Sequence, residues 1–222
     1  DPRGHLGFLG LGYASMVEKR SGAALEFFDQ AMTAAPDNVA ALRFKAKALK
    51  ELKRADDALA LYDRALALAP LDPESHHDRG VVLAMLREFG PAVEAFDRAL
   101  ALDPNHVASL SDKGKYAGEM GQHEVALSAL RRAAALMPDH PAPWINKALV
   151  EDILKRDEAA LASFEKFLER AKPEMRLQIE SSKRRVEQLR ARVAARQGPP
   201  ALRPVAGAPP PPAAPPPPSV PI

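Results

Sequence analysis

A glycine-rich segment near the start of the chain is the first candidate for chemistry. Gly7, Gly10 and Gly12 lie in GFLGLG, which superficially has the spacing of a phosphate-binding loop. A dinucleotide-binding loop of this kind follows a β-strand and leads into a helix that opens at the glycines. No strand pattern precedes this segment, so we do not expect it to bind a phosphate.

Histidine and acidic residues form no recognisable catalytic or metal-binding set. His76, His77 and Asp78 are consecutive, and on a helix they would fan over about 200°, too widely to ligate one metal. The chain has no cysteine, which excludes disulfides, thiol catalysis and cysteine-bound metal clusters. No nucleophile–base pair is recognisable either. We therefore expect a protein that is not an enzyme and that uses no cofactor.

Basic residues gather toward the C-terminal end. From Pro173 onward there are 8 Lys or Arg against 3 Asp or Glu, although the formal charge of the whole chain is only +2. Lys183, Arg184 and Arg185 could form a patch for nucleic acid or anionic lipid, or a localisation signal. Two glutamates interleave with these residues and favour a solvated helix face instead. We therefore do not expect nucleic-acid binding.

The elements that must position any site come from an internal repeat of 34 residues. Pro36, Pro70, Pro104 and Pro138 follow one another at this interval. Proline ends a helix because it lacks the N–H group and fixes φ. With each of these prolines at position 32 of its unit, the five units are 5–38, 39–72, 73–106, 107–140 and 141–174.

Small and large residues recur at fixed positions of the unit. Position 8 holds Gly12, Ala46, Gly80, Gly114 and Ala148, and position 20 holds Ala24, Ala58, Ala92, Ala126 and Ala160. Position 24 holds Phe28, Tyr62, Phe96, Leu130 and Phe164. Small residues let two helices approach, and large ones fill the space beside them. Each unit is therefore predicted to be two packed helices joined by a turn at positions 15 to 17.

These units resemble the tetratricopeptide repeat (TPR) family. The segments DDALALYDRALALAP (56–70) and PAVEAFDRALALDPN (91–105) are similar to the family's second helix almost position by position. The resemblance covers residues 5–174 and implies an all-α, right-handed α-solenoid of helix pairs with a concave binding surface. Two departures are notable. His76 replaces the large apolar residue or Trp of position 4, and position 7 carries a basic residue in four units.

The segments outside the five repeats differ in character. Residues 1–4 have the phase of the end of a preceding repeat. Residues 175–197 are predicted to form a basic amphipathic helix that caps the array. Residues 198–222 are rich in proline and are predicted to be polyproline II or disordered. That tail either serves an external proline-reading domain or packs against a repeat of its own or a neighbouring chain, where it would mediate self-association.

The family resemblance implies a peptide-binding groove lined by the first helix of each unit. Its expected residues are Tyr13, Met16, Arg43, Phe44, Lys47, Lys50, His77, Asp78, Val81, Asp112, Lys115, Ile145, Asn146 and Leu149. For the apolar residues of the first unit, the alternative is packing against a neighbouring unit. Co-chaperones of the family hold a C-terminal carboxylate with Lys, Asn and Arg, whereas Asp78 and Asp112 would repel a carboxylate here.

These observations predict a scaffold or adaptor that binds a protein, as a peptide or a partner helix, with the tail as a second interaction site. The other hypothesis is the regulatory or substrate-recruiting TPR portion of a larger enzyme, because family arrays occur fused to transferases and kinases. No stretch approaches the roughly 18 consecutive apolar residues of a membrane span. The sequence does not determine the compartment, although a chain without cysteine suits a reducing cytoplasm.

Overall fold

Helices make up the computed structural model, which describes residues 4–197, and these residues contain no strand. The helices are α1 (Gly4–Val17), α2 (Ser21–Ala34), α3 (Val39–Glu51), α4 (Ala55–Leu68), α5 (Pro73–Met85), α6 (Phe89–Leu102), α7 (Val107–Glu119), α8 (His123–Leu136), α9 (Pro141–Ile153), α10 (Asp157–Arg170), the 3₁₀ helix η1 (Pro173–Met175) and α11 (Arg176–Gln197). From α3 to α10, each helix begins and ends 34 residues before or after its counterpart in the next unit. The predicted all-α solenoid of helix pairs is confirmed. The proline-rich tail lies outside the described residues.

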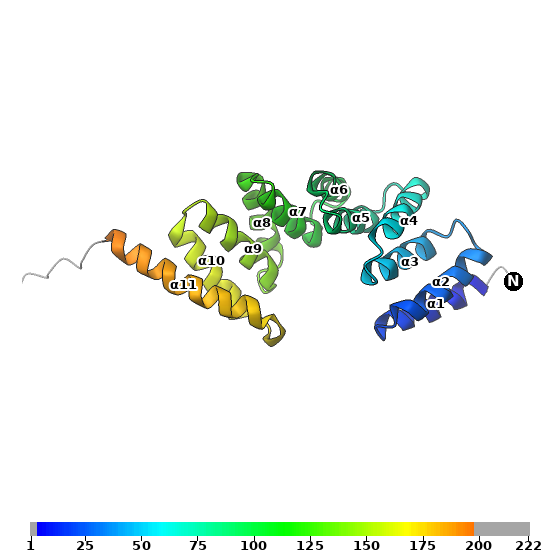
Figure 1. The fold of residues 1–222 in the computed structure, drawn as a ribbon. Helices are drawn as coiled ribbons and strands as arrows, with labels where there is room; N and C mark the ends of the chain where they lie inside the picture. Colours follow the sequence, from blue (N-terminus) through cyan, green and yellow to red (C-terminus); the bar gives the residue numbers. More distant parts are fainter. Residues whose placement is uncertain (1–3, 198–222) are drawn as a thin grey trace, which may run out of the picture.

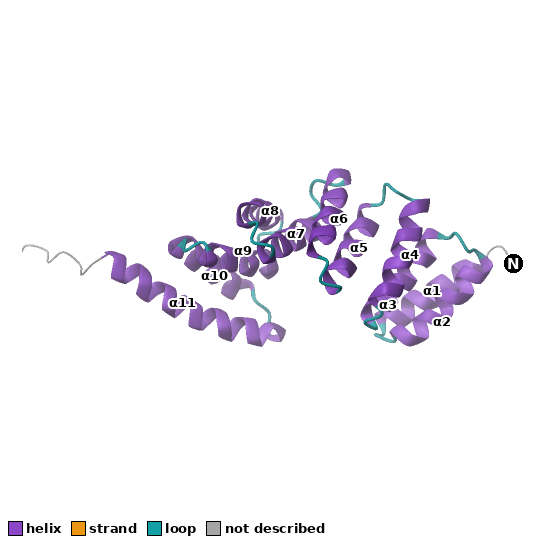
Figure 2. Ribbon diagram, turned by 45° about the horizontal axis from the view of Figure 1, so that its top comes forward, coloured by secondary structure: helices purple, strands orange, loops and turns teal. Residues whose placement is uncertain are grey.

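The helix pairs follow one another in chain order along an arch, with the two ends of the array far apart (Figures 1 and 2). The backbone of each first helix approaches that of the first helix of the next unit, whereas in the described residues the backbones of neighbouring second helices lie farther apart. Neighbouring units therefore lie closer together on the side of their first helices than on the side of their second helices. The first helices α1, α3, α5, α7 and α9 form what we call the inner face.

Small residues at position 8 allow the two helices of a unit to pack closely. A Cβ atom added to Gly12 would lie 2.3 Å from Cε1 of Phe28, and one added to Gly80 would lie 2.6 Å from Cε1 of Phe96. The fourth unit has the same geometry, with 2.4 Å between a Cβ on Gly114 and the Leu130 side chain. The large residue of position 24 thus occupies the space that the small residue leaves, as the pattern predicts.

Polar caps begin the first helices of the second to fifth units. The side chains of Asn38 and Asp72 accept hydrogen bonds from backbone N–H groups of α3 and α5. His106 and His140 do the same for α7 and α9 through Nδ1. These bonds satisfy N–H groups that have no partner within the helix.

The last helix, α11, packs against α10 through the apolar face that its sequence predicts. Ser182, Val186 and Leu189 are buried on this face. Arginines beside this face bind two buried carboxylates of the array. Arg192 Nη2 lies 2.9 Å from Oδ1 of Asp152 and 2.7 Å from Oδ1 of Asp157, which is fully buried. Part of the basic character of α11 therefore serves its own docking.

Candidate functional site

The residues predicted to line the groove all lie on first helices, but they differ in exposure. Tyr13, Lys47, Lys115 and Leu149 are exposed; Met16, Arg43, Phe44, Lys50, His77, Val81, Asp112, Ile145 and Asn146 are partly buried; and Asp78 is buried. The four exposed residues all occupy position 9 of their units. Position 13, which the family resemblance also implies for the groove wall, is exposed in all five units and lies four residues after position 9 on the same helix face.

An ion pair and a hydrogen bond between neighbouring first helices occupy the middle of the inner face. Lys50 Nζ lies 2.6 Å from Oδ1 of Asp78, and these two side chains join α3 to α5. His77 Nε2 lies 3.1 Å from Oδ2 of Asp112 and joins α5 to α7. These polar residues are engaged with one another, so their first effect is to hold the units in register.

Phe44 belongs to an aromatic cluster of the first two units. Its ring centroid lies 5.7 Å from that of Tyr13 in an edge arrangement and 6.0 Å from that of Phe28 in a stacked one. Met16 packs against the same cluster. Of these residues Tyr13 alone presents a large exposed fraction, 56%, to the inner face.

A buried phenol lies beneath the polar middle of the inner face. Tyr62 is fully buried, and its burial, followed by the charge of the neighbouring Asp78 carboxylate, raises the pKa of the phenol. Tyr62 therefore stays protonated and acts as a core residue.

Between α7 and α9 the inner face is hollowed into a cavity of about 290 Å³. Its lining residues are Lys115, Gly118, Glu119, Asn146, Leu149, Val150 and Ile153. Five of these belong to positions that the family resemblance implies for the groove: Lys115, Glu119, Asn146, Leu149 and Ile153. Leu149 and Ile153 are 49% and 57% exposed, so the cavity combines exposed apolar side chains with the charges of Lys115 and Glu119. Such a site can accept an apolar side chain of a ligand and pair with polar groups beside it.

Comparisons with known proteins agree with the repeat architecture. Models of the tetratricopeptide repeat match residues 18–77, 73–106 and 111–175. The chain belongs to the tetratricopeptide repeat family. A search of curated proteins finds no match.

Solved structures of other TPR proteins share the fold. PilW, a widely conserved type IV pilus biogenesis factor, matches with a TM-score of 0.73 at 22% identity over 86% of this chain and 92% of its own. PilF of Pseudomonas aeruginosa matches with a TM-score of 0.72 at 14% identity over 90% and 94%. YrrB, described as a TPR protein with an unusual peptide-binding site, matches with a TM-score of 0.64 at 19% identity over 79% and 90%. At these identities the likeness is one of fold.

The structure explains why His76 can replace a large residue of the TPR pattern. Its Nε2 lies 2.9 Å from the carbonyl oxygen of Pro70. In the fifth unit Trp144, at the equivalent position, donates from Nε1 to the carbonyl oxygen of Pro138 at 2.8 Å. Imidazole and indole thus contact the same carbonyl, six residues earlier, and hold the preceding turn.

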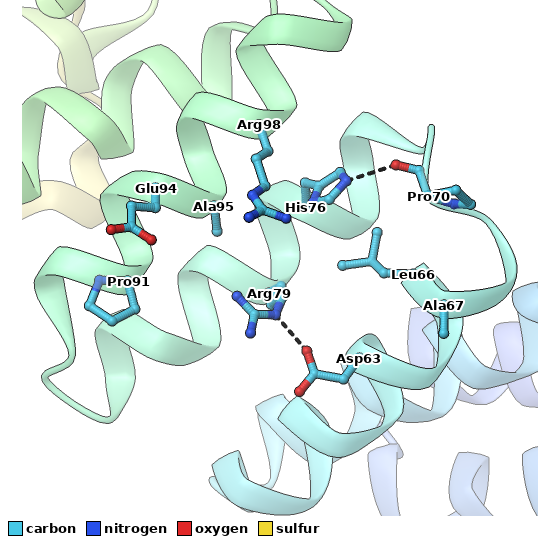
Figure 3. Close-up of a pocket in the computed structure, with 10 residues that line it drawn as sticks. All are labelled: Asp63, Leu66, Ala67, Pro70, His76, Arg79, Pro91, Glu94, Ala95 and Arg98. Carbon is cyan, nitrogen blue, oxygen red and sulfur yellow. Dashed lines mark hydrogen bonds and ion pairs between the residues drawn. The ribbon is translucent and has the colours of Figure 1, made fainter.

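The basic residues at position 7 form ion pairs on the opposite, outer side of the TPR array. Each of the first three junctions between units joins an Asp at position 25 to a basic residue 16 positions later. The pairs are Asp29 with Lys45, Asp63 with Arg79 at 2.6 Å, and Asp97 with Lys113 at 2.5 Å. We call this series the outer ladder. Figure 3 shows its second pair, beside a cavity of about 430 Å³ to which α4, α5 and α6 contribute.

Neither face of the described array contains a group of three or more His, Cys, Asp or Glu arranged to hold a metal ion. None of the described helices combines the length and apolarity that crossing a membrane requires.

Proposed function

We propose that this protein is an interaction scaffold or adaptor whose concave inner face binds a peptide or a partner helix. The cavity between α7 and α9 carries the proposal. It opens on the inner face and brings together Lys115, Asn146 and Leu149 from two neighbouring units. Stacked units of this kind form extended concave surfaces suited to elongated ligands.

The charges around the cavity indicate the kind of ligand. Leu149 and Ile153 offer exposed apolar area, while Lys115 and Glu119 place both signs of charge beside it. A peptide with an apolar anchor residue flanked by polar residues fits this arrangement. The polar contacts in the middle of the inner face leave less polar surface free there, so the anchor lies toward the C-terminal units.

A selected peptide tests this proposal. Peptides that bind the chain would be isolated from a random display library, and the affinity of one of them would be measured by fluorescence anisotropy. Leu149→Asp is expected to weaken binding at least tenfold, because it places a charge in the apolar cavity. Leu68→Asp is the matched control, since Leu68 lies on α4, a second helix, and is exposed to a similar extent, 45% against 49%. Equal affinities of the two variants would contradict the proposal.

The regulatory portion of a larger enzyme is the alternative role. It concerns the same inner face, because an array within an enzyme would recruit its substrate or regulator through that surface. A catalytic domain encoded in the same gene would favour this alternative. The role of the proline-rich tail as a second interaction site is part of the proposal, and a comparison of affinities before and after deletion of residues 199–222 tests it.

A further inference from the structure

The outer ladder is interrupted at its fourth junction. By the 34-residue period, Arg131 takes the place that Asp97 has one unit earlier, and Lys147 takes the place of Lys113. Two basic residues therefore occupy the positions at which the other junctions have an acid and a base. Like charges repel, so this junction lacks the attraction that links the earlier units.

The side chain of Lys147 pairs within its own unit. Its Nζ lies 2.9 Å from Oε1 of Glu151 and 2.7 Å from Oγ of Ser163, both within its own unit. Arg131 has no carboxylate within ion-pair distance among the residues that the structure describes, and it is exposed. The position at which the earlier junctions have an aspartate therefore holds a guanidinium group without a counterion in the described residues.

Further cations gather beside this junction, around the ring of Trp144. Lys166 Nζ lies 4.4 Å from the ring centroid, Lys147 Nζ 5.6 Å and Arg170 Cζ 5.9 Å. Arg170 is paired with Glu169, but within the described part of the chain no carboxylate pairs with Lys166. The patch thus contains two cations without an internal counterion.

We propose that this patch, formed by Arg131, Trp144, Lys147, Lys166 and Arg170, is a docking site for an acidic segment of a partner protein. A carboxylate of the partner would bind beside this junction, with Arg131 and Lys166 as its counterions. Guanidinium groups suit carboxylates because their parallel N–H donors match the two oxygen atoms. This surface lies on the outer side of the array, so the inference does not depend on the proposed groove.

The extent and surroundings of the patch favour an acidic peptide over a nucleic acid. The cations span one junction, whereas the first three junctions carry aspartates at the equivalent place. On α10 itself, the glutamates nearest to Lys166 in sequence are each paired with an arginine, Glu165 with Arg190 and Glu169 with Arg170. A phosphate backbone that extended along the outer side would meet the aspartates of the first three junctions, while a short acidic segment at the fourth junction would not.

The experiment uses the single tryptophan of the chain, Trp144, as the reporter. A hexaglutamate peptide is titrated into the full chain at low salt while the intrinsic fluorescence is recorded. Saturable change in the Trp144 emission is expected, with an apparent Kd that rises steeply with ionic strength. A thymidine oligonucleotide of equal charge is titrated in parallel, and stronger binding of the oligonucleotide would overturn the choice of a peptide.

Arg131→Asp is the decisive variant because it restores the acid of the ladder opposite Lys147. It is expected to raise the melting temperature of the array and to weaken hexaglutamate binding at least tenfold. Arg98→Asp, on α6, makes the same change of charge at an exposed residue of the outer side and is expected to alter the Kd less than twofold. Equal losses in the two variants, or no saturable change in the wild type, would overturn the proposal. A raised melting temperature with unchanged hexaglutamate binding would also overturn it.

Discussion

One residue in the turn of every helix pair has a left-handed backbone. The φ angles are 59° at Lys19, 63° at Lys53, 65° at Arg87, 75° at Gly121 and 58° at Lys155. In the second unit the N–H of Arg54 donates to the carbonyl of Leu49 at 2.9 Å, and that of Lys53 donates to Lys50 at 3.1 Å. This pair of bonds ends the helix and requires a positive φ at its centre. Four of the five residues at this place therefore carry backbone strain that glycine avoids.

Replacing such a residue by glycine should stabilise the array. For Lys53→Gly we expect about 1 kcal/mol of relieved strain, offset by roughly 0.5 kcal/mol from the greater freedom of glycine in the unfolded chain. The net gain in the free energy of unfolding, near 0.5 kcal/mol, would be measured by urea denaturation. Lys47→Gly, inside the preceding helix α3, is the control and should cost about 1 kcal/mol. A loss of stability in both variants would contradict the assigned strain.

At the residue scale, the sequence predicted which positions of the repeat are equivalent. It did not predict which of the long charged side chains form ion pairs with one another. The small residue at Gly80 and the large one at Phe96 were predicted as packing partners, because volume alone determines that contact. The pairing of Arg79 with Asp63 was not predicted, since it depends on how one unit sits on the next. A signal in the sequence could have revealed the outer ladder. Asp recurs at position 25 together with a basic residue at position 7 of the next unit, and Arg131 breaks this pattern.

At the scale of elements, α11 shows how far amphipathic spacing reaches. The spacing of Ile179, Ser182, Val186, Leu189 and Val193 predicts one face that packs against the array. The structure buries the middle three of these residues and leaves Ile179 and Val193 partly buried. The spacing did not predict that Arg185 and Arg192 would reach carboxylates some 33 to 40 positions earlier. Such bonds depend on where the last unit places Asp152, and a helical period does not contain that information.

The ionisation of Asp152 should make the attachment of α11 sensitive to acid. Burial opposes ionisation of this carboxyl, but hydrogen bonds from Arg185 and Arg192 outweigh burial, so that its pKa is lowered below the ordinary 3.8. A carboxyl whose pKa is lower in the folded state stabilises the fold above its unfolded pKa. This contribution is lost as the pH falls from about 4 through the folded value.

We therefore predict that Asp152→Asn lowers the free energy of unfolding at pH 6 by about 2 kcal/mol, the size of a charged hydrogen bond, and by less at pH 3. Urea denaturation at the two pH values measures both differences. Glu26→Gln, at an exposed acid of α2 without an ion partner in the described residues, should show almost no change at either pH. An equal effect of Asp152→Asn at pH 6 and pH 3 would contradict the role of its charge.

At the scale of the whole molecule, the middle and the ends of the inner face differ. Contacts between first helices hold the middle together, whereas the ends expose more of their side chains. Lys50 with Asp78 and His77 with Asp112 join successive first helices. Beyond them, Tyr13 at one end and Leu149 at the other are about half exposed. Phe44 was predicted for the groove, but its ring lies among aromatic neighbours, so its substitution would disturb packing as well as any binding. Residues at position 9 are therefore better probes of the groove than those at position 6.

The linear arrangement of units predicts that the same substitution has different consequences in the centre and at an end. Ala24 and Ala92 both occupy position 20 and are fully buried. Leucine at either place should overpack a helix pair and cost about 1–3 kcal/mol. Each unit contacts its neighbours alone, so the stability of the array is the sum of unit and interface contributions.

Ala24→Leu should therefore release the first unit locally, while Ala92→Leu should lower the unfolding midpoint of the array as a whole. Hydrogen exchange resolved by segment distinguishes these outcomes. In Ala24→Leu, we expect faster exchange in α1 and α2 and unchanged protection in α7 to α10. In Ala92→Leu, protection should fall on both sides of α6, since the third unit shares interfaces with the second and the fourth. Uniform loss of protection in both variants would show that the array unfolds as one cooperative unit and would contradict this prediction.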